Sequence, residues 1–199
     1  MTLTAGFHPL PKGHLSTVVT HLEMTSRPSN HTRQDIPDGL SLTAHPAPSV
    51  DWYRDLYRRV GQNWLRFSRL VCRDAELAAT IHDADVHIFS IDLDGHAEGI
   101  CELDFREGGK CELAFFGLTE KLIGTGAGRA LMSHAISEAF ARDIELFYVH
   151  TCTLDSPQAL SFYIRSGFTP VRQEIEIAPD PRVTGVIDRR AAPQIPIFD

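Results

Sequence analysis

"LIGTGAGRALM", residues 122–132, places glycines at positions 124, 126 and 128 and then continues as a helical pattern. Glycine lowers the stability of a helix, so three of them at a helix start indicate that the backbone itself is needed there. The first N–H groups of a helix have no partner within the helix and lie at the positive end of its dipole. The stretch therefore predicts a loop that binds an anion, most often a phosphate group.

Two well-known phosphate loops do not fit these residues. The nucleotide P-loop requires a Lys-Ser or Lys-Thr pair after its glycines, and none follows here. The dinucleotide fingerprint G-x-G-x-x-G would need its third glycine where Arg129 stands. That fingerprint also follows the first strand of a parallel unit, whereas antiparallel strands are predicted before this loop. Both nucleotide-loop interpretations are rejected.

The hydrophobic pattern around the loop predicts an α/β (α+β) chain with a mixed, mostly antiparallel sheet. Helices are predicted from Ser49 to Gly61, from Asp74, over 126–141 and over 156–166. Strands are predicted over 15–24, 39–45, 86–95, 97–105, 110–118, 144–154 and 168–177. We divide the chain into an N-terminal arm (1–39), a main domain (40–178) and an irregular tail (179–199).

Composition narrows the class of protein. The 199 residues carry a formal charge of −7, which argues against nucleic-acid binding. Four cysteines occur without a CxxC pair, and the histidines and acidic residues show no metal-site spacing, so no metal site is predicted. Neither a signal peptide nor a membrane-spanning apolar run is evident. We expect a cytoplasmic protein that does not bind membranes.

Two longer stretches resemble, in the right order, the signatures of the GCN5-related N-acetyltransferase (GNAT) superfamily. "CELAFFGLTEKLIGTGAGRALM" (111–132) is similar to that family's strand, pyrophosphate loop Q/R-x-x-G-x-G/A and helix. "CTLDSPQALSFYIRSGFTP" (152–170) is similar to its second signature. The matching positions of that second signature are Ser156, Ala159, Tyr163, Gly167 and Phe168. The resemblance covers about residues 40–177 and departs from the family at Ile123, in place of Gln or Arg, and at Ser156, in place of Asn.

The resemblance implies an acyl-CoA-dependent N-acyltransferase with acetyl-CoA (coenzyme A) as co-substrate. An amine would attack the thioester directly, between splayed strands at 110–118 and 144–154. The acceptor would be a small-molecule or peptide amine. The resemblance is also compatible with a homodimer. The cofactor-binding residues that the resemblance implies are Phe116, Gly117, Leu118, Ile123, Gly124, Thr125, Gly126, Ala127, Gly128, Arg129, Ser156, Ala159 and Phe162.

Acyl transfer to an amine needs a base for the amine and benefits from an acid for the leaving thiolate. Tyr163 is the predicted acid, because it lies four residues after Ala159 on the helix face that carries the motif. Glu112 is the predicted base, since even spacing places Glu112, Ala114, Phe116 and Leu118 on one strand face. The alternatives for the base are Glu102, Asp104, His150 and water.

Aromatic residues of the first helical layer are candidates for the acceptor pocket, where they could contact a cationic amine. They are Trp52, Tyr53, Tyr57, Trp64 and Phe67. Two alternatives to an enzyme remain: a non-catalytic acyl-CoA-binding or sensor module, which would bind acyl-CoA without releasing thiol, and an interaction protein without affinity for CoA.

Overall fold

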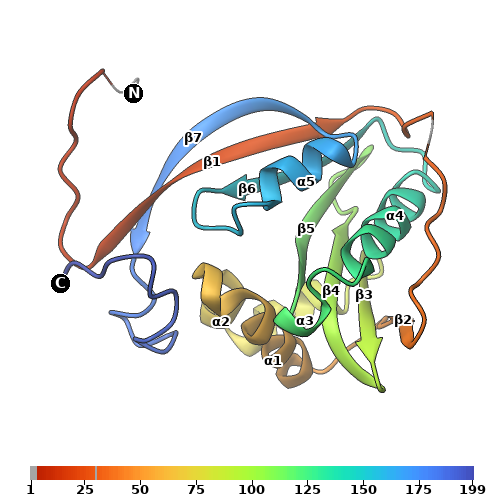
Figure 1. Ribbon diagram of the computed structural model, residues 1–199, viewed down its shortest axis with the longest axis horizontal. Helices are drawn as coiled ribbons and strands as arrows, with labels where there is room; N and C mark the ends of the chain where they lie inside the picture. Colours follow the sequence, from red (N-terminus) through yellow and green to blue (C-terminus); the bar gives the residue numbers. More distant parts are fainter. Residues whose placement is uncertain (1–3, 30) are drawn as a thin grey trace.

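The computed structural model describes residues 4–29 and 31–199, and this part of the chain forms one mixed sheet with helices packed against it (Figure 1). Its strands are β1 (His14–Met24), β2 (Leu40–Ala44), β3 (Val86–Leu93), β4 (His96–Asp104), β5 (Lys110–Leu118), β6 (Leu146–Cys152) and β7 (Thr169–Pro179). Its helices are α1 (Val50–Gly61), α2 (Ser68–Val71), α3 (Asp74–Ile81), α4 (Ala127–Ala139) and α5 (Ala159–Arg165). The predicted fold class is confirmed.

The strand order β2-β3-β4-β5-β6-β1-β7 explains why the sheet is mixed. Only β5 and β6 pair in parallel, because α4 connects them as a crossover, and all other pairs are antiparallel. The N-terminal strand β1 lies between β6 and β7 and pairs with both (Figure 1). Residues 14–24 are therefore an interior strand of the sheet, although the sequence places them in the arm.

Two apolar layers cover the two faces of the sheet. One face packs against α4 and α5 and includes Leu131, Phe147 and Phe168. The other packs against α1 and α3 and includes Tyr53 and Ile100. Helix α1 begins where the sequence predicts, because the Ser49 hydroxyl accepts a hydrogen bond from the backbone N–H of Trp52.

A β-bulge in β5 overturns one sequence-based prediction. Phe115 pairs with Glu102 and Leu113 with Leu103, so one residue of β5 has no partner in β4. Beyond the bulge the side chains change face. Phe115 packs with α1, whereas Phe116 packs on the α4 side. The prediction that Glu112 and Phe116 share a face by simple alternation is therefore wrong.

The C-terminal segment after β7 contains turns only, but it is anchored. The buried Arg182 side chain pairs with Asp180 and donates to the backbone carbonyl oxygens of Ala191, Ala192 and Ile195. The backbone N–H of Gly13 donates to the carbonyl of Phe198, which ties the end of the chain to the start of β1. Across residues 4–29 and 31–199, no helix has the length and apolar character to cross a membrane.

Candidate active site

The parallel pair β5–β6 separates soon after it begins. The two strands are paired from Lys110 with Leu146 to Glu112 with Tyr148, and no further. Beyond this point β5 continues beside β4 and β6 continues beside β1. The facing edges of β5 and β6 are left without a neighbouring strand, so their backbone groups are available to a ligand. The predicted splay between these two strands is present.

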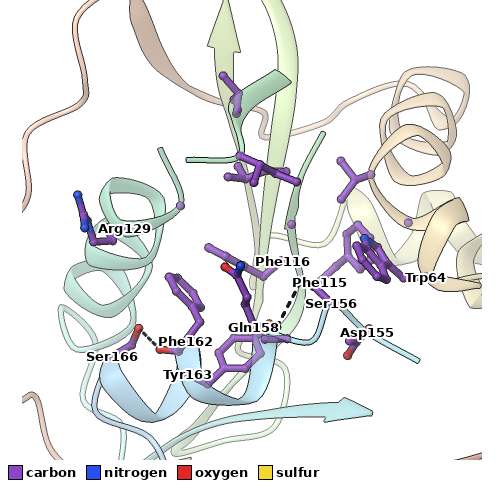
Figure 2. A pocket seen from close by; sticks show the side chains of 18 of the residues that line it. Trp64, Phe115, Phe116, Arg129, Asp155, Ser156, Gln158, Phe162, Tyr163 and Ser166 are labelled. Atoms are coloured by element: carbon purple, nitrogen blue, oxygen red, sulfur yellow. Dashed lines mark hydrogen bonds between the residues drawn. The ribbon is translucent and has the colours of Figure 1, made fainter. Parts of the chain in front are cut away.

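A cleft of about 760 Å³ occupies this gap and extends through the sheet. On the α4 side it is lined by the glycine loop and by α5, and on the α1 side by residues near Trp64 and Arg66. Figure 2 shows this arrangement, with Arg129 and Trp64 at opposite sides and Phe162 and Tyr163 reaching in from α5. A ligand entering from the α4 side can thus meet another entering from the α1 side.

The glycine loop presents free backbone N–H groups to the cleft. Gly124 and Gly126 have φ angles of 83° and 92°, a left-handed conformation that strongly favours glycine. Among the residues described, the N–H groups of Gly124, Gly126 and Gly128 donate to no protein acceptor. They lie at the start of α4, where the helix dipole favours an anion. This geometry suits a phosphate or diphosphate group.

Most of the predicted cofactor-binding residues line the cleft. They are Phe116, Gly117, Leu118, Ile123, Gly124, Gly126, Gly128, Arg129, Ser156, Ala159 and Phe162. Two predicted residues, Thr125 and Ala127, do not line it. The Thr125 side chain instead stays within the loop, where its hydroxyl donates to the carbonyl of Leu122.

The cleft also contains polar residues that the sequence reasoning missed. Gln158 and Arg165 of α5 line it, as do Arg66 and Asp155. Gln158 and Arg165 lie within the second signature, so their helical spacing could have indicated them. Arg66 and Asp155 are brought together only by the fold.

Arg66 and Asp155 form a bridge between the α1 side and the β6–α5 loop. Arg66 Nε donates to Asp155 Oδ1 at 2.8 Å and Nη2 to Oδ2 at 2.5 Å. The same carboxylate accepts from the Thr151 hydroxyl at 2.6 Å and from the backbone N–H of Cys152 at 2.9 Å. The bidentate pair fixes the position of the loop that precedes α5.

Ser156 can cap a helix, but it does not cap α5. The helix begins at Ala159 with Gln158 at its N-cap, and no side chain caps it. Ser156 forms a turn before the helix, in which its carbonyl accepts from the N–H of Ala159. At the other end, Gly167 ends the helix with a φ of 109°, a conformation that favours glycine.

Tyr163 is buried at the base of the cleft. Its ring centroid lies 6.4 Å from that of Phe116 and 5.7 Å from that of Phe162. Burial, together with the charge of Asp155, raises the pKa of the Tyr163 hydroxyl. The hydroxyl is therefore protonated at neutral pH and is available as a hydrogen-bond donor.

Glu112 and His150 lie together on the sheet face that α1 covers. Glu112 Oε1 is 3.6 Å from His150 Nδ1. Burial and the nearby charge of Asp104 raise the pKa of Glu112. Burial and the charge of Arg66 lower the pKa of His150. The structure thus brings two candidate bases into one pair.

The other two candidate bases are engaged in different roles. Glu102 is fully buried under α1, where Tyr53 and Arg69 donate to its carboxylate. Asp104 is held by Arg106. Partial burial opposes ionisation of Asp104, but the hydrogen bonds from Arg106 outweigh it and lower the pKa. A base needs a free carboxylate, which neither residue offers.

Most of the aromatic residues that were candidates for the acceptor pocket belong to the hydrophobic core. Tyr53 and Tyr57 are buried between α1 and the sheet, and Tyr57 stacks on Phe115 at 4.2 Å. The Trp52 ring packs against His45 in a tilted arrangement, and Phe67 packs in the cluster that joins β1 to the C-terminal segment. Of the five aromatic residues only Trp64 lines the cleft.

Comparison with protein families gives a match over the larger part of the chain. Residues 49–168 match the model of the "Acetyltransferase (GNAT) family". The match includes the glycine loop, the splayed strands and α5, which are the parts that form the cleft. No curated protein matches the sequence.

Solved structures with this fold are more distant in sequence. A GCN5-related N-acetyltransferase from Sphaerobacter thermophilus superposes with a TM-score of 0.63 at 14% identity, over 83% of this chain and 53% of the other. A tandem GNAT protein from the clavulanic acid biosynthesis pathway gives 0.61 at 13% identity, over 81% and 53%. An aminoglycoside acetyltransferase from an uncultured soil metagenomic sample gives 0.55 at 14% identity, over 67% and 90%. The chain thus spans about half the length of the first two structures, and the likeness concerns the fold.

Proposed function

Because the chain belongs to the acetyltransferase (GNAT) family, we propose that it transfers an acetyl group from acetyl-CoA to a primary amine. The observation that carries this proposal is the glycine loop, whose three free N–H groups open onto a cleft between splayed strands. These groups would bind the diphosphate of CoA, and the pantetheine arm would lie along the free edge of β5. The thioester would then reach the gap in the sheet.

Two cations support the phosphate site. The family's Gln or Arg at the first loop position is replaced here by Ile123, which is 59% exposed and offers no charge. Arg129 of α4 and Arg165 of α5 both line the cleft. We propose that they provide the cationic side chains for the CoA phosphates in place of that residue.

The reaction would follow direct attack. The amine nitrogen bonds to the thioester carbonyl carbon, and the carbon–sulfur bond breaks. The departing thiolate takes a proton from the Tyr163 hydroxyl, which solvent then replaces. The proton of the amine passes to the pair formed by Glu112 and His150. The acceptor would enter from the α1 side, where this pair faces.

We propose that the acceptor is a small-molecule or peptide amine. An amine panel, with free CoA thiol measured by Ellman's reagent, tests it and separates three hypotheses. The enzyme binds acetyl-CoA and releases thiol with at least one amine. A sensor module binds acetyl-CoA and releases none, and an interaction protein shows no binding by calorimetry.

The phosphate site is tested by substituting Gly124 with alanine. The added methyl group disfavours the φ of 83° and displaces the N–H groups, so the Kd for acetyl-CoA should rise tenfold or more. Binding of S-acetyl-pantetheine, which lacks the diphosphate, should change little. Calorimetry measures both.

Gly95→Ala is the matched control, since Gly95 has a similar φ of 77° in the remote β3–β4 turn and nothing lies within 4 Å of its added methyl. It should lose similar folding stability and keep its affinity for acetyl-CoA. Equal acetyl-CoA affinity in Gly124→Ala and Gly95→Ala would remove the loop from the proposal.

A further inference from the structure

Titratable side chains form a row across four neighbouring strands, on the face that α1 covers. Glu112 of β5 lies 3.6 Å from His150 of β6. His150 is the register partner of His21 in β1, and their ring centroids are 5.9 Å apart. His21 Nε2 lies 2.8 Å from Glu174 Oε2 of β7. The row thus runs from the point where β5 and β6 separate to the edge of the sheet.

The inner end of this row lies beside the cleft. Glu112 is the last β5 residue paired with β6, so it marks the apex of the gap. Arg66 and Asp155 line the cleft, and the Asp155 carboxylate accepts a hydrogen bond from Thr151, the residue that follows His150 in β6. Glu112 and His150 do not line the cleft themselves; they adjoin it where the pairing of β5 and β6 ends.

The two nitrogens of His150 differ in their surroundings. Nδ1 faces the Glu112 carboxylate, which makes the tautomer with hydrogen on Nδ1 the favoured one. Among the residues described, Nε2 has no hydrogen-bond partner, so its lone pair is free. The distance of 3.6 Å is longer than a hydrogen bond, and pairs of this kind commonly tighten when substrate binds.

We propose that His150 Nε2 is the general base that takes the proton of the acceptor amine, and that Glu112 orients the ring and stabilises the imidazolium. This assignment rests on the proposed function and goes further, because it gives a separate role to each of the two candidate bases. It follows the geometry by which a carboxylate supports a catalytic histidine.

The proton transfer balances within this pair. Before the amine attacks, one N–H bond of its ammonium form breaks and an Nε2–H bond forms; the second proton that the nitrogen loses as the amide forms passes to solvent. The imidazolium and the Glu112 carboxylate then carry opposite charges side by side. His150 is 41% exposed, so its proton can return to solvent after the amide product leaves.

The remaining charged groups around His150 keep it neutral in the resting state. Burial, the Arg66 cation and His21 all lower the pKa of His150, while Asp155 opposes them. On β7, Arg172 and Glu174 hold the His21 ring from both nitrogens.

The flanking side chains on β6 that share this face are Tyr148, whose hydroxyl is directed to Glu107 at 3.5 Å, and Cys152. On β1, Glu23 is the register partner of Tyr148 and lies on the same face as His21.

The test is the pH profile of kcat/KM for the full chain, with an amine acceptor found in the panel. His150→Gln should lower kcat/KM at pH 7 by about 10²-fold or more. The deficit should shrink as the pH approaches the pKa of the amine, because more of the amine is then already neutral. The Kd for acetyl-CoA should not change.

His87→Gln is the matched control. His87 also pairs with a carboxylate, at 3.0 Å from Glu138, and is 25% exposed, but it packs beside α4 on the other face of the sheet. Its pH profile should match the wild type. Glu112→Gln should shift the acidic limb of the profile to lower pH, since the imidazolium loses its carboxylate.

The outcomes separate the assignment from the function. A wild type that binds no acetyl-CoA and turns over no amine overturns the proposed function. An active wild type whose His150→Gln variant behaves like His87→Gln overturns the base assignment alone. If the acidic limb of the kcat/KM profile is lost in Glu112→Gln but kept in His150→Gln, Glu112 is the direct base. That result also overturns the assignment of His150 as the base.

A spectroscopic readout checks the role of Glu112 without turnover. Nitrogen-15 NMR of the imidazole should show hydrogen on Nδ1 of His150 in the wild type, with the signal assigned by its absence in His150→Gln. In Glu112→Gln the Nδ1–H tautomer should lose its preference. An unchanged tautomer in Glu112→Gln would contradict the orienting role.

Discussion

Tyr163 is proposed as the acid, and its position at the cleft supports that proposal. It is 7% exposed, lies among aromatic rings, and lines the cleft. Burial raises its pKa, so the hydroxyl stays protonated across the neutral range. A thiolate formed beside it in this low-dielectric region would gain most from that proton.

Tyr163→Phe should therefore lower kcat by about 10²-fold and leave the Kd for acetyl-CoA within about twofold. The phenyl ring keeps the contacts with Phe116 and Phe162, so only the hydroxyl is removed. Steady-state kinetics and calorimetry on the same preparation measure the two effects. Wild-type kcat in this variant would show that Tyr163 is not the acid.

At the level of single residues, one sequence prediction failed for a local reason. The alternation rule assigns Phe116 to the face of Glu112, but the bulge between them moves Phe116 to the α4 side. A bulge inserts one residue without a mark in the hydrophobic pattern. Its position can be read only from the pairing of β5 with β4.

Among the secondary-structure elements, β1 is the one whose role the sequence did not indicate. Its pattern predicts a strand, and the strand is present from His14 to Met24. Its neighbours, β6 and β7, lie more than a hundred positions further along the chain. Because β7 pairs with β1 and not with β6, β7 depends on the N-terminal strand for its place in the sheet.

Leu22→Ala should measure how strongly β1 supports the fold. Leu22 is fully buried and packs with the cluster under α4 and α5. Its truncation should lower the free energy of unfolding by about 2–5 kcal/mol. Val18→Ala, at a position 37% exposed on the same strand, should cost much less.

Urea denaturation followed by circular dichroism gives both values. If Leu22→Ala and Val18→Ala destabilise equally, β1 does not contribute to the core as described. That result would also place the strand outside the sheet in solution, with β7 left unpaired.

For the whole molecule, several histidines make the stability depend on pH. Burial lowers the pKa of His31, His45, His134 and His150 below the usual value of 6.5. For His134, no partner lies within hydrogen-bond distance of either ring nitrogen among the residues described, and its ring packs on Phe89. The folded protein thus favours the neutral form of these side chains.

The sign of the effect follows from proton uptake. Below about pH 6.5 the unfolded chain binds protons that the folded chain resists, so the free energy of unfolding falls as the pH falls. This contribution is fully present above pH 6.5 and is lost on acidification. We expect a lower free energy of unfolding at pH 5.5 than at pH 7.5.

Urea denaturation at the two pH values measures the difference. His134→Leu should reduce the difference in the free energy of unfolding between pH 7.5 and pH 5.5. It should also raise the free energy of unfolding at pH 5.5, because a leucine has no polar atoms to leave unpaired. His96→Gln, at an exposed position at the start of β4, should leave the difference unchanged. A stability that does not vary between pH 5.5 and 7.5 would contradict the expectation.

The sequence by itself determined the elements, the family and one half of the cleft. The glycines at 124, 126 and 128 and the residues of α5 act through local backbone conformation, which neighbours in the sequence control. Tertiary structure alone decided the rest: the place of β1, the bulge in β5, the bridge from Arg66 to Asp155 and the pairing of Glu112 with His150. These depend on contacts between segments far apart in the chain, and residue spacing carries no information about which distant strands become neighbours.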